Sequence, residues 1–250
     1  MGVSLSDWKV LGASVEGSGH RRDSTGCQDS HAWTLAAPDT LVAAVADGAG
    51  SARRAAEGST LAATFSVEYV AWRLCEHERV DPLELLSDAM GATRSQLARL
   101  ARRDRHPIGD LATTLALVIA SPDGVWAAQV GDGSVVVHQL DGSLLAVADG
   151  EREEYLNETT FLTSKSWRSA CVIEEVPTRV ESIALLTDGL GLLALDLTDG
   201  GRPHVPFFKP LLGFARAEDA CPTELERFLE SDRVATRTDD DVTLLLATLS

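Results

Sequence analysis

Three Asp-Gly pairs in this chain each follow a run of small or apolar residues. They are Asp47 in LVAAVADG, Asp132 in WAAQVGDG and Asp188 in SIALLTDG. Each acid is expected where a buried strand reaches the rim of the core. Carboxylates gathered at one rim repel each other unless a cation binds them, and Mg²⁺ and Mn²⁺ prefer such oxygen ligands. A following glycine lets a backbone carbonyl approach the ion. The pattern therefore predicts a site for divalent metal ions.

Further acids are expected at the same rim, whereas other Asp-Gly pairs have the context of ordinary turns. Asp29 in GCQDSHAW precedes one strand-like run, and Asp240 in TDDDVTLLLA precedes another. In contrast, Asp123 and Asp141 each lie between two strand-like runs, where Asp-Gly is typical of a hairpin turn. The position of an acid relative to its strand thus separates candidate metal ligands from turn residues.

Strands have to position these acids, and strand-like segments dominate the chain. Alternating or continuous apolar residues favour strands in 7–17, 31–48, 111–147, 170–189 and 239–250. Segment 31–48 is expected to be a hairpin, and segment 111–147 a meander of three or more antiparallel strands. Because strands neighbour strands along the chain, the sheets are expected to be mostly antiparallel. The polar segment 18–30 is expected to be a loop.

Two long helices are expected to interrupt the strands. Segment 51–77 is rich in Ala and has apolar residues at helical spacing, and segment 81–104 begins with Asp81 as a cap and Pro82 in the first turn. A short helix is expected over 222–232, with Thr223 as its cap. Helices that are segregated from strands in this way predict an α+β fold.

Composition excludes several classes of partner. The chain has 250 residues and a formal net charge of −16, so neither nucleic acid nor an anionic membrane is expected as its main partner. It contains no apolar run long enough to span a bilayer and no signal-peptide pattern at its start. Its four cysteines are far apart and form no CxxC pair, which favours reduced thiols over a zinc site. These features together predict a cytoplasmic protein.

Seven motifs, taken in order along nearly the whole chain, resemble those of one family. The family is that of the metal-dependent serine/threonine protein phosphatases called PP2C (PPM), in its compact bacterial form. The motifs are GCQDSHAW, VAAVADGAGSARRAAEGS, LATTLALVIA, AAQVGDGSVVVHQLDG, YLNETTFLTS, IALLTDGL and TDDDVTLLLATL. The resemblance implies a single domain over residues 1–250. It also implies two antiparallel β-sheets packed as a sandwich and flanked by pairs of α-helices.

The resemblance further implies a centre of two Mn²⁺ or Mg²⁺ ions at one edge of the sandwich. Asp47 would bridge both ions, and the carbonyl of Gly48 would bind one of them. Asp188 and Asp240 would complete the shell of the other. Asp241 stands at the place where the family usually has Asn or Asp.

The chemistry implied by the resemblance is hydrolysis of phosphoserine and phosphothreonine in proteins. Asp29 would orient metal-bound water, and Asp132 would help to hold a third, weaker ion. A hydroxide bridging the two ions would attack phosphorus, and the ions would neutralise charge on the phosphoryl oxygens. This implies a phosphorylated protein as substrate, and a Ser/Thr kinase or its targets as possible partners.

Two departures from the family pattern concern proton transfer and phosphate binding. Many members have His after the Asp-Gly pair as a candidate general acid, but this chain has Ala49 there. His20 and His31, which flank the first acidic motif, are alternatives. The family usually has an arginine five residues before the first acid, whereas here Arg21 and Arg22 lie further upstream. They are the candidates for phosphate binding because a guanidinium can donate two hydrogen bonds to phosphate.

Two other functions remain open at this point. One is a phosphatase-like sensor or adaptor with little turnover that binds a phosphoprotein or a kinase, which the two departures would permit. The other is structural calcium binding by the acids. Calcium binding is less favoured because the EF-hand pattern DxDxDG is absent from the sequence.

Overall fold

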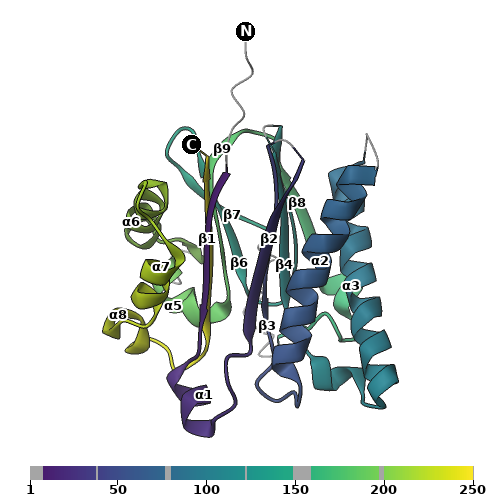
Figure 1. Ribbon diagram of the computed structural model, residues 1–250. Coiled ribbons are helices and arrows are strands. Elements are labelled where there is room, and N and C mark those ends of the chain that lie inside the picture. Colours follow the sequence, from purple (N-terminus) through teal and green to yellow (C-terminus); the bar gives the residue numbers. More distant parts are fainter. Residues whose placement is uncertain are drawn as a thin grey trace.

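Two five-stranded β-sheets pack face to face, and helices cover the outer face of each sheet (Figure 1). The computed structural model describes residues 8–37, 39–76, 80–121, 123–148, 159–196 and 200–249. The strand pairs within both sheets are antiparallel. The α+β sandwich expected from the sequence is therefore confirmed.

The strand order shows how distant parts of the chain are brought together. The first sheet has the order β1-β12-β9-β6-β7, and the second has the order β2-β3-β4-β5-β8. The strands of the first sheet are β1 (Trp8–Val15), β12 (Val242–Leu249), β9 (Val180–Leu186), β6 (Ser134–Gln139) and β7 (Leu144–Val147). The strands of the second are β2 (Asp29–Ala37), β3 (Thr40–Asp47), β4 (Leu115–Ser121), β5 (Gly124–Val130) and β8 (Val172–Val176).

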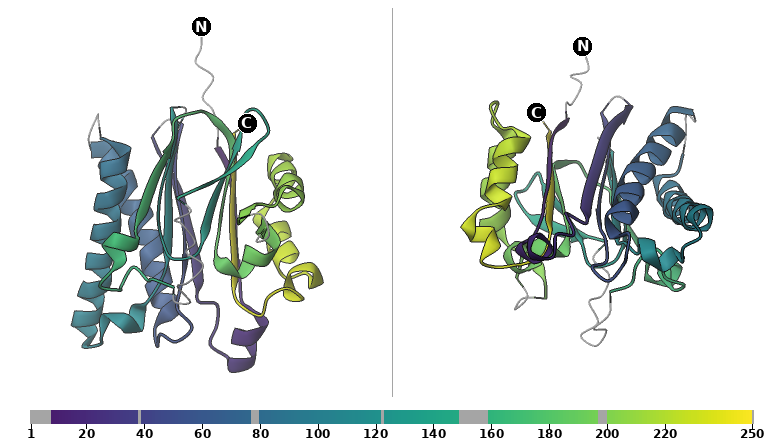
Figure 2. Two further views of the ribbon diagram at one scale, coloured as in Figure 1. Left: turned by 180° about the vertical axis from the view of Figure 1, so that it is seen from behind. Right: turned by 60° about the horizontal axis from the view of Figure 1, so that its bottom comes forward.

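The helices form a layer on each side of the sandwich (Figure 2). The second sheet is covered by α2 (Ala55–Glu76) and α3 (Pro82–Asp104). The first sheet is covered chiefly by α6 (Val205–Arg216) and α7 (Pro222–Leu229). The short elements are α1 (Ser18–Asp23), α4 (Trp167–Ala170), α5 (Gly191–Ala194), α8 (Asp232–Ala235), the 3₁₀ turns η1 (Ile108–Leu111) and η2 (Asp188–Leu190), and the pair β10 (Leu195–Asp196) and β11 (Arg202–Pro203).

The start of α3 follows its sequence signals. Asp81 caps the helix, because its Oδ1 accepts hydrogen bonds from the backbone N–H groups of Leu83 at 2.8 Å and Glu84 at 3.4 Å. Pro82 occupies the first turn, where its missing N–H is not needed. The helix is therefore stabilised at the predicted residue, by about 1 kcal/mol for a cap of this type.

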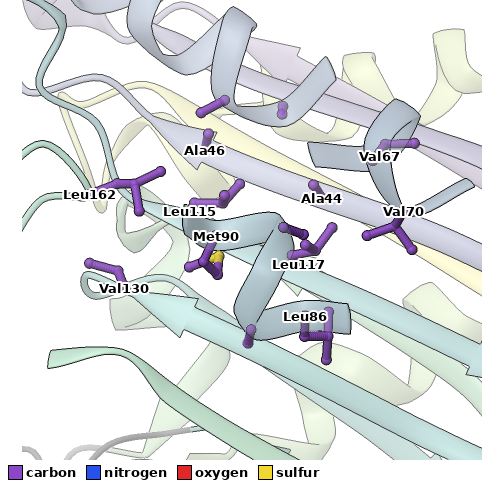
Figure 3. Packing of buried hydrophobic residues seen from close by; sticks show 14 of the residues in the cluster. Ala44, Ala46, Val67, Val70, Leu86, Met90, Leu115, Leu117, Val130 and Leu162 are labelled. Atoms are coloured by element: carbon purple, nitrogen blue, oxygen red, sulfur yellow. The ribbon is translucent and has the colours of Figure 1, made fainter. Parts of the chain in front are cut away.

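Aliphatic and small side chains join this pair of helices to the second sheet (Figure 3). Val67 and Val70 of α2 and Leu86 and Met90 of α3 belong to one buried cluster with residues of β3, β4 and β5. Met90 is completely buried, and truncation of such a side chain to Ala costs about 2–5 kcal/mol. This packing holds α2 and α3 against the second sheet, in which β3 ends at Asp47.

The direction of the strands places the predicted acids at one end of the sandwich. β3 ends at Asp47, β9 ends just before Asp188, and β12 begins just after Asp241. We call this the carboxylate end, and α1 also lies there (Figure 1). The opposite end, which we call the turn end, carries the β2–β3, β4–β5 and β6–β7 connections.

The predicted meander over 111–147 is wrong in one respect. β4 and β5 pair in the second sheet, whereas β6 and β7 pair in the first. The chain crosses between the sheets at Gly131, Asp132 and Gly133, and Gly131 has a φ of +106°, which favours glycine. The crossing allows Asp132 to lie at the carboxylate end between the two sheets.

Two smaller predictions are also wrong. The polar segment expected to be a loop contains the helix α1. The short helix α7 is capped at Cys221, with Pro222 in its first turn, so the predicted cap Thr223 lies inside the helix. Pro222 fixes the backbone for the first helical position, and this moves the start of the helix upstream. None of the described helices has the length and apolarity needed to cross a membrane.

Candidate metal centre

Three of the predicted ligands converge at the carboxylate end. One carboxylate oxygen each from Asp47, Asp132 and Asp188 lies within 4.8 Å of the others. Asp47 ends β3 of the second sheet, Asp188 follows β9 of the first sheet, and Asp132 lies on the crossing between them. Three acidic oxygens at such separations form a donor set suited to a hard divalent cation.

Asp47 is held through its backbone, so its carboxylate is not needed for the fold. Its N–H donates to Thr114 Oγ1 at 3.0 Å, and its carbonyl accepts from Thr114 N at 2.8 Å and from Thr113 Oγ1 at 2.9 Å. These two threonines belong to the Thr-Thr motif of the sequence. The motif therefore fixes the end of β3 and leaves the Asp47 side chain to face the rim.

Gly48 lies where the chain leaves β3 and approaches α2. Its N–H donates to the carbonyl of Gln28 at 3.1 Å. A Cβ at this position would lie 2.6 Å from backbone atoms of Ala55, the first residue of α2. Only glycine permits this close approach, so the predicted ligand Gly48 stays beside Asp47 at the start of the long helix.

Asp188 is tied to the start of β12 by its neighbours. Thr187 donates its N–H to the carbonyl of Thr243 at 3.3 Å, and Thr243 donates its N–H to Thr187 Oγ1 at 3.0 Å. A Cβ on Gly189 would lie 2.0 Å from the carbonyl oxygen of Asp241. This close backbone contact explains why a glycine is needed after Asp188.

Asp29 lies beside Asp47, because the two residues are partners in the β2–β3 register. Its buried carboxylate accepts a hydrogen bond from Thr187 Oγ1 at 2.7 Å through Oδ2. Its Oδ1 is buried and has no hydrogen-bond partner among the described residues. An unpartnered buried carboxylate oxygen is costly, so Oδ1 fits a role in which it accepts a hydrogen bond from a bound water.

Asp240 lies outside the set of three carboxylates but is close enough to act on it. Its charge contributes to the raised pKa values of both Asp47 and Asp188. Its Oδ1 accepts a hydrogen bond from the N–H of Asp241 at 2.8 Å, and the residue is exposed. Asp240 thus lies at the rim of the cluster.

Asp132 is supported by a residue of the fifth motif, YLNETTFLTS. Thr159 Oγ1 lies 2.6 Å from Asp132 Oδ2 and donates a hydrogen bond to it. Part of that motif, residues 155–158, lies outside the described residues. The contact fixes one oxygen of Asp132, and each of the three acids still offers one carboxylate oxygen to a metal ion.

Burial and mutual repulsion raise the pKa of several acids in the cluster. Burial raises the pKa of Asp47 to about 10, with further contributions from Asp29, Asp188, Asp240 and Asp132. The pKa of Asp188 is raised to about 6 by burial and by the charges of Asp132 and Asp240. Burial also raises the pKa of Asp29 to about 7 against the opposing effect of its hydrogen bonds. Without a cation, the cluster therefore retains protons that a divalent ion would displace.

Asp241 has a role that the sequence did not reveal. Its carboxylate is buried and accepts hydrogen bonds from the N–H of Gly17 at 2.7 Å and from the N–H of Gln28 at 2.6 Å. Oδ2 also lies 2.8 Å from His20 Nδ1. Asp241 therefore joins both flanks of α1 to the start of β12. The sequence placed Asp241 only as the last of three consecutive acids and at the position where the family usually has Asn or Asp.

The predicted phosphate-binding arginines lie on α1, near this end of the sandwich. Arg21 donates two hydrogen bonds to the carbonyl of Glu16, at 3.0 and 2.6 Å. Arg22 lies 3.6 Å from Asp239, and both side chains of that pair are about three-quarters exposed. Among the described residues, neither guanidinium pairs with Asp47, Asp132 or Asp188.

A family model and a curated relative that match this chain both describe protein phosphatases. A family model described as Protein phosphatase 2C matches residues 16–230. Serine/threonine-protein phosphatase 3 of Escherichia coli (strain K12) is 35% identical over 252 residues, which cover 96% of this chain and 98% of that protein. Both matches include the acidic motifs from Asp29 to Asp188.

Solved structures share the fold at lower identity. The catalytic domain of the serine threonine protein phosphatase PstP, in complex with two manganese ions, has a TM-score of 0.64 and 17% identity. The match covers 97% of this chain and 98% of that one. RsbX in complex with magnesium has a TM-score of 0.59 and 17% identity, with coverage of 97% and 96%. At these identities, the comparison supports the arrangement of the sheets and helices.

Proposed function

This chain belongs to the protein phosphatase 2C family, and we propose that it hydrolyses phosphoserine and phosphothreonine in proteins at the carboxylate end. The enzyme class expected from the motifs, a PP2C-type serine/threonine-protein phosphatase, is confirmed by this membership. The convergence of Asp47, Asp132 and Asp188 within 4.8 Å is the observation that carries the proposal. We further propose that residues 1–250 act as one domain on phosphoproteins of the cytoplasm.

The donor set fits two Mn²⁺ or Mg²⁺ ions and a third, weaker one. Asp47, Asp188, Asp240 and the carbonyl of Gly48 would hold the two ions, and Asp132 would contribute to the third. This assignment is supported by acids whose raised pKa values reflect close, uncompensated negative charge. When bound, such ions supply a water of lowered pKa and neutralise charge on phosphoryl oxygens.

Other residues of the chain would position the water and the phosphate. Asp29 would accept a hydrogen bond from the attacking water through its unpartnered Oδ1, while Thr187 holds its Oδ2. Arg22 would bind a phosphoryl oxygen. Its pair with Asp239 is highly exposed and therefore weak, so the guanidinium can leave it. Arg21 would contribute after release from the carbonyl of Glu16.

A phosphoserine peptide and p-nitrophenyl phosphate test the proposal together. We expect the chain to hydrolyse both with Mn²⁺ and neither after chelation of the metal. Asp188→Asn should lower kcat/KM by at least about 100-fold, whereas Asp123→Asn at the turn end should leave it unchanged. Equal rates in the two variants would contradict the site assignment.

The same measurements separate the enzyme from a sensor or adaptor. An adaptor would bind Mn²⁺ in calorimetry and retain a phosphoprotein or a partner kinase, but it would show no turnover on either substrate. Measured turnover on the phosphopeptide would exclude this alternative. Activity on p-nitrophenyl phosphate alone would confirm a metal-dependent phosphatase but contradict the proposed substrate class.

A further inference from the structure

The departing oxygen of phosphoserine or phosphothreonine needs a proton, because an alkoxide is a poor leaving group. A positioned acid in such a step typically contributes about 10²–10⁴-fold in rate. The residue that follows the first Asp-Gly pair is Ala49, which has no proton to donate. A side chain that donates this proton therefore belongs to another segment that reaches the carboxylate end.

His20 is placed by α1 beside the loop that contains Ala49. A Cβ built on Gly50, the next residue, would have His20 Nε2 at 3.9 Å as its nearest neighbour. About one-fifth of the His20 side chain is exposed. Nε2 therefore lies at the loop that follows Asp47 and Gly48, and the ring is accessible to a substrate.

The opposite nitrogen of the same ring is held by Asp241. His20 Nδ1 lies 2.8 Å from Asp241 Oδ2, which is the distance of an ion pair, and it has no aligned hydrogen-bond partner among the described residues. The Asp241 carboxylate cannot easily turn away, because the backbone N–H groups of Gly17 and Gln28 fix its two oxygens. A buried carboxylate on one ring nitrogen orients the other nitrogen, as in other acid–base pairs of this type.

The other described histidines do not offer the same geometry. His31 is two residues inward from Asp29, and its Nδ1 lies 2.8 Å from Ser14 Oγ. Its ring packs against Gly12 of β1, where an added Cβ would lie 2.5 Å from the ring. His31 therefore faces the space between the sheets. The remaining three have partners in other places: His106 pairs with Asp110, His138 with Glu181, and His204 with the carbonyl of Leu193.

We infer that His20 is the catalytic acid of this enzyme and that Asp241 is its positioning residue. The inference rests on the proposed phosphatase function. A water molecule releases one proton to solvent as its oxygen forms a bond to phosphorus, and the bond between phosphorus and the Ser or Thr oxygen breaks. The electron pair of that bond stays on the departing oxygen, which takes the proton from His20 Nε2. The neutral imidazole then regains a proton from solvent.

Substrates with different leaving groups test this role. His20→Gln should lower kcat for a phosphoserine peptide by about 100-fold. The same variant should change kcat for p-nitrophenyl phosphate by less than about threefold, because p-nitrophenolate departs without a proton. His138→Gln, at the turn end, is the matched control and should affect neither substrate.

The Asp241→Asn variant tests whether Asp241 positions His20 or only supports the fold. Asp241→Asn should show the same selective loss on the phosphopeptide, in a smaller amount. Long-range ¹⁵N NMR of the His20 ring, recorded without metal, should show Nδ1 protonated in the wild type and a mixture of tautomers in Asp241→Asn. This readout does not depend on activity, so it remains informative if a variant loses turnover.

Three outcomes would overturn the inference. Equal losses on both substrates in His20→Gln would assign His20 a structural role. An unchanged rate on the phosphopeptide would remove it from the reaction. An Nδ1 that is unprotonated in the wild type would contradict the pairing with Asp241. Failure of the wild type to hydrolyse either substrate would instead count against the proposed function.

Discussion

Asp-Gly pairs lie at both ends of the sandwich, but the aspartates at the two ends have opposite electrostatic environments. At the turn end, Asp141 accepts hydrogen bonds from Ser143 N at 2.9 Å and from Ser143 Oγ at 2.6 Å. These contacts lower its pKa. At the carboxylate end, Asp47 and Asp188 lie near other acids, and their pKa values are raised. The carboxylate of Asp141 is satisfied within its own turn, whereas the carboxylate end brings together acids from separate strands.

The difference shows how the fold separates stability from function. Removal of an acid at the turn end affects only a local, exposed contact. The acids at the carboxylate end oppose the folded state when they are ionised without a cation, because burial and mutual repulsion disfavour their charge. Carboxylates with perturbed pKa values of this kind are typical of ligand-binding and catalytic sites.

The largest expected contrast between the ends is in activity. Asp47→Asn should lower kcat/KM on p-nitrophenyl phosphate with Mn²⁺ by about 10³-fold, because it removes a charge from the centre of the cluster. Asp141→Asn makes the same chemical change at the turn end and should leave kcat/KM within about twofold. Comparable losses in both variants would contradict the division between the two ends.

The pH dependence of stability should have opposite signs at the two ends. With metal chelated, the folded chain keeps protons on Asp47 and Asp188 above the ordinary pKa of 3.8, whereas the unfolded chain loses them. The free energy of unfolding should therefore fall as the pH rises from about 4 through 6 and on toward 10. Urea unfolding at pH 5, 7 and 9 measures the decline, which Mn²⁺ should reduce and Asp47→Asn should flatten.

The control for this pH effect lies at the turn end. The lowered pKa of Asp141 gives stability that is present above its ordinary value of 3.8 and is lost as the pH falls below it. Asp141→Asn should therefore leave the decline from pH 5 to 9 unchanged. A wild-type curve that rises with pH in EDTA would show that the carboxylates do not repel each other in the folded chain.

Two glycines on the side of the carboxylate end should differ in the cost of an added Cβ. Gly189→Ala would place a Cβ 2.0 Å from the carbonyl of Asp241, so the backbone at the metal centre must shift, at a cost of about 1–3 kcal/mol. Gly109→Ala, in η1 on the same side of the molecule, meets no atom within 4 Å and should be nearly neutral. Thermal unfolding in EDTA measures both. A neutral Gly189→Ala would mean that the two segments do not approach as closely as described.

The smallest contrast concerns hydroxyl groups that support the acids. Thr187→Val removes a buried donor to Asp29 Oδ2 and an acceptor for Thr243 N, which should cost about 1–3 kcal/mol of unfolding free energy. Ser143→Ala removes the hydroxyl that donates to Asp141 at an exposed site, leaves the backbone N–H bond in place, and should cost less than about 0.5 kcal/mol of unfolding free energy. Chemical denaturation measures both, and equal costs would weaken the comparison.

Much of the fold and the cluster could be predicted because their signals are local. The cap Asp81 and the apolar runs before Asp47 and Asp188 are readable from neighbouring residues, and the strands lie where those runs indicate. The Asp-Gly turns at Asp123 and Asp141 also lie between paired strands. These features need no knowledge of distant contacts.

The features that the sequence did not reveal depend on distant contacts. α1 consists of polar residues and is held by Asp241, which lies more than 200 residues away along the chain. α6 contains Pro206 and an internal Pro210, which disfavour a helix when considered alone. The helix forms because Phe208 is completely buried against the first sheet. Phe208 is therefore a core residue.

The central place of β12 has a consequence for how the protein is made. This strand lies between β1 and β9, although β1 is the earliest described strand and β12 the latest. On the ribosome, β1 therefore has no partner in its sheet until residues 242–249 have been translated. Asp240 and Asp241 arrive at the same moment. A growing chain would thus acquire phosphatase activity abruptly and late in its synthesis, instead of by degrees.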